Sequence, residues 1–133
     1  MPKIDALSAV AHDIAHHAQS GLSWLYPHLG EACREAATLS STIDLTEPQP
    51  YPKDLPTRAP LRLALGALRR TLAALLERHG FSLGDLTEAQ LEFRFPEGFG
   101  DGSLYSVRSR LVCRGRAFER HLLRIDELPR ANR

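Results

Sequence analysis

Three histidines near the start of the chain form the segment HDIAHH at residues 12–17. His12 and His16 are four residues apart, so on a helix their imidazoles lie on one face and can bind the same metal ion. Further on, His28 and Glu31 are three residues apart, which also places two ligands on one helical face. The sequence therefore predicts a possible divalent metal site (zinc, manganese or iron) with the ligands His12, His16, His28 and Glu31.

The segment from His12 to His16 resembles the H-E-x-x-H motif of zinc metalloproteases, with Asp13 at the position of the general-base glutamate. The resemblance implies a metal-dependent hydrolase in which the metal activates a water molecule and Asp13 orients a ligand. A chain reversal at Ser20-Gly21 is also similar to the helix-hairpin metal sites of ferritin-like and DinB-like proteins, because it brings His28 near His16. The alternative is that these histidines are solvated residues on the polar side of a helix.

Arginine is concentrated near the end of the chain, where residues 104–133 contain eight arginines and three acidic residues. Basic side chains on a hairpin can line the phosphates of a nucleic acid or another polyanion. The overall pI of about 7.9 is lower than that of typical nucleic-acid-binding domains. A solvated or self-associating sheet face is therefore the alternative for the same residues. The candidate residues for either role are Arg108, Arg110, Arg116, Arg120, Arg124 and His121.

No other pattern supplies a catalytic group. Cys33 and Cys113 have no histidine beside them, and no G-x-S-x-G motif is present. The glycine-rich segment at residues 96–103 lacks the glycine spacing of phosphate-binding loops. We assign no catalytic residue and expect a binding domain rather than an enzyme.

The composition is that of a single globular domain. The 133 residues are 43% hydrophobic and 25% charged, which is enough to bury a core. We expect neither a signal peptide nor a membrane span, and the two dissimilar cysteines favour a reducing cytoplasm. The net charge of +1 combines four basic and seven acidic residues in 1–60 with thirteen basic and nine acidic residues in 61–133.

The clearest predicted element is a central helix over residues 61–79. Apolar residues recur there at steps of three and four, which is typical of an amphipathic helix. Thr57 is the predicted N-cap, and Gly80 occupies the position where a left-handed residue ends a helix. The core is therefore expected to form on this helix.

Two segments precede the central helix. Residues 4–39 are predicted to be helical, either as two helices or as one helix kinked at Ser20-Gly21. Residues 40–60 contain five prolines and form an extended connection, in which residues 42–45 can make a short edge strand.

Antiparallel strands are predicted over residues 89–126. Apolar and polar residues alternate from Ala89 to Phe95, which indicates a strand with one buried face. A two-residue turn at Arg114-Gly115 predicts a hairpin with complementary pairs on both faces. The expected pairs are Leu111 with Phe118, Val107 with Leu122, Arg110 with Glu119 and Arg108 with His121.

Together these elements predict a single α+β domain with two or three helices packed on one face of a three- to four-stranded antiparallel sheet. No helix remains to cover the second face, which carries Gln90, Glu92, Arg94, Arg108, Arg110, Glu119 and His121. This uncovered face and the proline-rich connection favour a small cytoplasmic domain that binds itself, as a homodimer through the sheet edge or face, or another protein. Metal-dependent chemistry and polyanion binding are the competing hypotheses.

Overall fold

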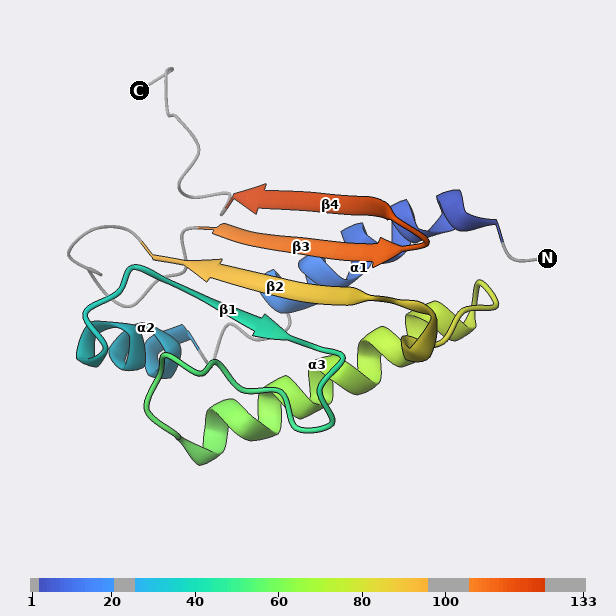
Figure 1. Cartoon of the computed structure of the whole chain (residues 1–133). Coiled ribbons are helices and arrows are strands. Elements are labelled where there is room, and N and C mark those ends of the chain that lie inside the picture. Colours follow the sequence, from blue (N-terminus) through green and yellow to red (C-terminus); the bar gives the residue numbers. More distant parts are fainter. Residues whose placement is uncertain (1–2, 21–25, 96–105, 124–133) are drawn as a thin grey trace, which may run out of the picture.

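Three helices and four strands make up the part of the chain described in the computed structural model, residues 3–20, 26–95 and 106–123 (Figure 1). The helices are α1 (Leu7–Ser20), α2 (Tyr26–Glu35) and α3 (Ala59–Glu77), and short 3-10 turns occupy Ile4–Ala6 and Leu83–Asp85. The strands are β1 (Ser40–Asp44), β2 (Glu88–Arg94), β3 (Ser106–Cys113) and β4 (Arg116–Leu123). The N-terminal segment thus contains two helices rather than one kinked helix. None of the described helices is long and apolar enough to cross a bilayer.

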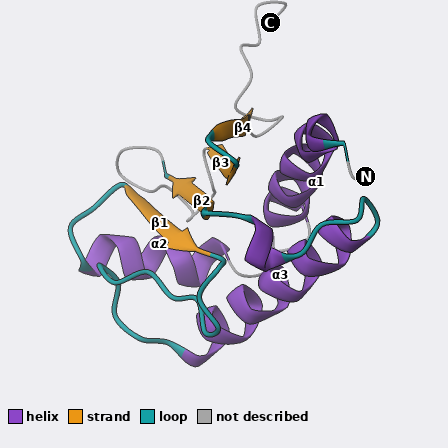
Figure 2. Cartoon of the chain, turned by 45° about the vertical axis from the view of Figure 1, so that its right-hand side comes forward, coloured by secondary structure: helices purple, strands orange, loops and turns teal. Residues whose placement is uncertain are grey.

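The strands form one antiparallel sheet in the order β1-β2-β3-β4, and α3 connects β1 to β2. All three helices lie on the same side of this sheet (Figures 1 and 2). Helix α1 packs against both β3 and β4, and also against α3. The predicted α+β fold is therefore confirmed, with the number of strands at the upper end of the predicted range.

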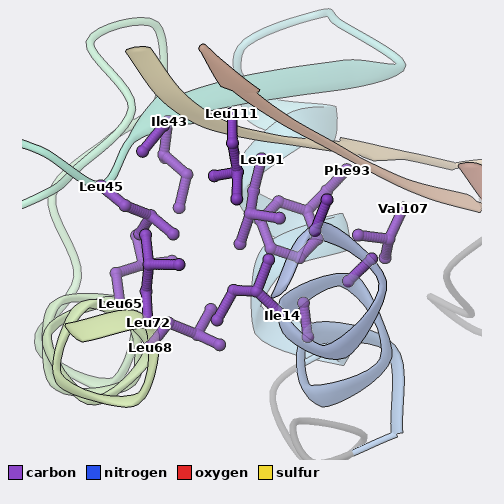
Figure 3. Packing of buried hydrophobic residues seen from close by; sticks show 14 of the residues in the cluster. Ile14, Ile43, Leu45, Leu65, Leu68, Leu72, Leu91, Phe93, Val107 and Leu111 are labelled. Atoms are coloured by element: carbon purple, nitrogen blue, oxygen red, sulfur yellow. The ribbon is translucent and has the colours of Figure 1, made fainter. Parts of the chain in front are cut away.

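The core lies between the sheet and helices α1 and α3 (Figure 3). Alternation along the strands sends one set of side chains to this side, so that Leu91 and Phe93 of β2 are fully buried. Each large apolar side chain buried in this way stabilises the fold by about 1.5–3 kcal/mol relative to exposure. The buried leucines of α3 are the ones that its periodicity predicts: Leu61, Leu65, Leu68, Leu72, Leu75 and Leu76.

The two ends of α3 differ in how well the sequence predicts them. At the C-terminal end, Gly80 has a φ of 80° and the amide of Phe81 donates to the carbonyl of Leu76 at 2.9 Å, as expected for a glycine-terminated helix. At the N-terminal end the predicted cap, Thr57, is wrong, because the N-cap residue is Arg58 and its side chain makes no cap hydrogen bond. The guanidinium of Arg58 instead pairs with Glu35 of α2 at 2.5 Å.

The hairpin of β3 and β4 forms in the predicted register. Arg114 and Gly115 have φ values of 53° and 78°, which is the signature of a type I′ turn. This turn joins strands directly, so the register of the whole hairpin follows from it. All four predicted pairs are present: Leu111 with Phe118, Val107 with Leu122, Arg110 with Glu119, and Arg108 with His121.

Candidate interaction surface

The face of the sheet opposite the helices is a polar surface to which all four strands contribute. Two rows of paired residues cross it, Thr42–Glu92–Arg108–His121 and Asp44–Gln90–Arg110–Glu119. A hollow of about 150 Å³ lies between these rows, lined by residues from both. The two rows carry charges of both signs, so this part of the face is suited to contact with water or with a polar partner rather than to burial against an apolar face.

Ion pairs organise the charges on this open face. The guanidinium of Arg110 lies 3.2 Å from the carboxylate of Glu119 and 3.8 Å from that of Glu88. All three side chains are about two-fifths to one-half exposed, so each pair contributes less than about 1 kcal/mol. The pairs set the positions of these side chains more than they stabilise the fold.

Strand β4 is one edge of the sheet, and the direction of its backbone groups follows from two observations. The amide of Thr87 donates to the carbonyl of Val112 at 2.9 Å, so even-numbered residues of β3 point their backbone groups toward β2 and odd-numbered residues toward β4. Because Leu111 pairs with Phe118, the even-numbered residues of β4 bond to β3. The N–H and C=O groups of Ala117, Glu119 and His121 therefore point away from the sheet.

No described residue satisfies these outward groups of Ala117, Glu119 and His121. The only outward group of β4 with a partner among the described residues is the carbonyl of Leu123, which accepts a hydrogen bond from Gln19 Nε2 at 2.7 Å. No described element covers this edge in either view (Figures 1 and 2). An eight-residue edge strand whose outward groups lack partners in the described part of the chain is a template for another strand.

Strand β1, the opposite edge, is shorter and partly blocked. Its odd-numbered residues bond to β2, as shown by the hydrogen bond from the amide of Leu45 to the carbonyl of Ala89. The outward groups of Ser40 are both held by the hydroxyl of Thr38, at 2.7 Å and 3.3 Å. The outward carbonyl of Asp44 accepts from the amide of Glu47 at 3.4 Å. These local hydrogen bonds occupy the two ends of the edge, and the outward groups of Thr42 between them have no partner among the described residues.

The predicted metal ligands lie on two helices. His12 and His16 are exposed neighbours on α1, with ring centroids 6.2 Å apart, and His16 Nδ1 lies 3.4 Å from the hydroxyl of Ser20. His28 and Glu31 are exposed on α2. Within residues 3–20, 26–95 and 106–123, no three histidine, cysteine or acidic side chains are gathered as metal ligands. The metal hypothesis stays a prediction.

The predicted arginine site is divided between two sides of the sheet. Arg108 and Arg110 of β3 lie on the open face, opposite His121 and Glu119 of β4. Arg116 and Arg120 of β4 point to the other side of the strand and lie on the helix side. Arg116 pairs with Asp5 at 3.0 Å and its guanidinium lies 5.1 Å from the ring centroid of Phe118. Arg124 is outside the described residues. Polyanion binding through these arginines also stays a prediction.

Both cysteines are free and buried. Burial is the main cause that raises the pKa of Cys33 to about 11, with a smaller contribution from Asp54. A thiol with this pKa is protonated at neutral pH and is a poor nucleophile. Cys33 is therefore a core side chain and not a reactive thiol.

A groove along the edge of β1 was not predicted from the sequence. Its lining comes from β1 and from the connection after it, including Thr42, Tyr51 and Asp54. Hydroxyl or acidic residues occupy every second position from Thr38 to Thr46, which is typical of a strand with one polar face, but this pattern does not place the connection beside β1. The sequence predicts residues 40–60 as an extended connection with a short edge strand and predicts no groove there.

Comparisons with known proteins give no match: no family model, no curated protein and no solved structure resembles the chain significantly. The basis for a functional proposal is therefore the arrangement of the residues themselves.

Proposed function

We propose that this chain is a self-associating domain that forms a symmetric dimer by pairing β4 with β4 of a second copy. The observation that carries the proposal is the row of outward backbone groups at Ala117, Glu119 and His121, which no described residue satisfies, on an eight-residue edge strand. Two-fold symmetric dimers are the commonest protein oligomers. An antiparallel pairing of the two β4 strands satisfies the outward groups and gives a continuous eight-stranded sheet.

One register makes the two β4 strands complementary. If the two-fold axis passes between the two copies of Arg120, Glu119 of each copy lies opposite His121 of the other on the open face. On the helix side, Phe118 then lies opposite Leu122 of the second copy. Both Glu–His pairs form between groups that can attract or hydrogen-bond, and both Phe–Leu pairs are apolar.

Moving the register by two residues removes this complementarity. An axis at Glu119 places two glutamates opposite each other and pairs Phe118 with Arg120. An axis at His121 pairs two histidines and sets Arg120 opposite Leu122. The preferred register also has one unfavourable pair, Arg120 with Arg120, at its centre. Both arginines are exposed, so water screens their repulsion.

The test is the mass of the purified chain in solution, measured by multi-angle light scattering over a range of concentrations. We expect a dimer for the wild type and a monomer for His121→Pro, because proline removes an outward N–H that has no acceptor among residues 3–20, 26–95 and 106–123. Thr42→Pro is the matched control, since Thr42 also points its N–H outward but from the opposite edge. A wild-type monomer at high concentration, or equal effects of the two prolines, contradicts the proposal.

A further inference from the structure

The edge of β1 carries a groove that the proposed dimer does not use. The groove has a volume of about 450 Å³ and lies between β1 and the connection that follows it. This volume is within the range of sites that hold small ligands or short peptide segments. In Figure 1 the connection runs back beside β1 before it reaches α3. Residues of both segments line the groove, so the strand and the connection form its two walls.

The second wall is held in place by specific contacts. The hydroxyl of Ser41 on β1 donates to Asp54 Oδ1 at 2.9 Å. The hydroxyl of Tyr51 donates to the carbonyl of Pro56 and accepts from the amide of Arg58 at 2.8 Å. Leu55 is buried in the core. The groove is therefore a built feature with fixed walls and not a gap beside a loose loop.

Free backbone groups lie in the middle of the first wall. The outward groups of Ser40 and the outward carbonyl of Asp44 are already bonded within the chain. The outward N–H and C=O of Thr42 and the N–H of Asp44 have no partner among the described residues. Thr42 and Asp44 both line the groove. An extended peptide can satisfy these groups as an added strand.

The charge of the lining selects the kind of peptide. Three carboxylates, those of Asp44, Glu47 and Asp54, line the groove with a single cation, Lys53. The remaining lining side chains are mostly hydroxyls and an amide, which are able to hydrogen-bond to an ammonium or guanidinium group. The lining thus carries an excess of two negative charges, which favours a positively charged ligand.

We propose that this groove binds a lysine- or arginine-containing segment of a partner protein, in extended conformation, as a fifth strand beside β1. The backbone of the segment pairs with Thr42, and its basic side chains lie against Asp44, Glu47 and Asp54. Binding at β1 leaves β4 free, so in a β4-linked dimer the two grooves lie at opposite ends of the sheet. This inference stands independently of the dimer.

The test uses a fluorescent, end-capped peptide of alternating lysine and valine, with a glutamate–valine peptide of equal length as its control. Fluorescence anisotropy should show saturable binding of the lysine peptide alone, weakening with added salt. Thr42→Pro should abolish binding while leaving the solution mass unchanged, and Glu47→Gln/Asp54→Asn should weaken it about tenfold. Glu77→Gln is the matched control, because it removes an exposed carboxylate at the end of α3 that lines neither the groove nor β4.

Two results overturn the inference. One is equal binding of the lysine and glutamate peptides, or none at millimolar concentration. The other is lysine-peptide binding that Thr42→Pro leaves unchanged, which places the peptide elsewhere on the molecule. Asp54→Asn keeps an acceptor for Ser41, so circular dichroism of the double variant should match the wild type and exclude unfolding as the cause of lost binding.

Discussion

The hydroxyl of Ser109 on β3 donates a 2.6 Å hydrogen bond to the carbonyl oxygen of Ala11 on α1. Ser109 faces the helices and is fully buried, although it is polar and its neighbours on this side of the sheet are otherwise apolar. The bond satisfies a hydroxyl that would cost free energy if it were buried alone. It also fixes where α1 lies beneath β3 and β4, and so supports the strand that we propose as the dimer edge.

Ser109→Ala should lower the free energy of unfolding by about 1 kcal/mol, because it removes a buried hydrogen bond. The cavity that the lost hydroxyl leaves is small and should add little to this cost. Urea denaturation followed by circular dichroism measures this change. Ser8→Ala is the control, since Ser8 is exposed on α1, the helix that contains Ala11. Its substitution should change the free energy of unfolding by less than about 0.5 kcal/mol. Equal effects of both substitutions would show that the Ser109 contact contributes nothing.

The turn between β3 and β4 predicts two opposite effects of substitution. Gly115 has a φ of +78° and an added Cβ would meet no atom within 4 Å, so Gly115→Ala should cost about 1 kcal/mol through backbone strain alone. Arg114 also has a positive φ, of 53°, so Arg114→Asn should stabilise the protein by about 0.5 kcal/mol. Thermal unfolding measures both. A destabilising Arg114→Asn would be inconsistent with the type I′ turn.

Cys33 predicts a dependence of stability on alkaline pH. Its pKa is raised from 9.0 to about 11, mainly by burial, so folding favours the neutral thiol. The stabilisation is complete below pH 9 and is lost as the pH rises from 9 to about 11, because the unfolded chain then releases a proton that the folded chain keeps. The urea midpoint should therefore fall further between pH 8 and pH 10.5 for the wild type than for Cys33→Val. The opposite order would contradict burial of the thiol.

Charge substitution on the open face tests the proposed register. Glu119→Lys should weaken the dimer about tenfold, because each lysine then lies opposite His121 of the other copy. The double variant Glu119→Lys/His121→Glu should restore the affinity by exchanging the two charges. Glu92→Lys is the control, since Glu92 also faces an arginine of β3 but lies on the interior strand β2. Sedimentation equilibrium gives the dissociation constants, and weakening by Glu92→Lys equal to that by Glu119→Lys would argue against the β4 interface.

The sequence predicts the elements whose signals are local and repeated. The leucine spacing of α3, the alternation in β2 and the Arg114-Gly115 turn each determine their own structure, and the pairing of Arg110 with Glu119 follows from the turn. The N-cap at Thr57 fails because Arg58 takes that position and pairs with Glu35, a contact from another helix. The groove depends on how residues 46–58 return to β1, and the contact of Ser41 with Asp54 spans thirteen residues without any periodic pattern. Such tertiary contacts leave no signal in a single sequence.

The most direct test of the dimer is oxidative crosslinking of a single introduced cysteine. In the proposed register residue 120 faces its own copy across the two-fold axis, at a Cα separation of about 4.5–5.5 Å that suits a disulfide. Arg120→Cys should therefore form a covalent dimer under mild oxidation, whereas Ala117→Cys should not, because its two copies lie about 20 Å apart along the strands. The native cysteines are buried, so the wild type serves as the blank. Crosslinking of Ala117→Cys in preference to Arg120→Cys, or of neither in a chain that is dimeric in solution, would contradict the pairing of β4 with β4.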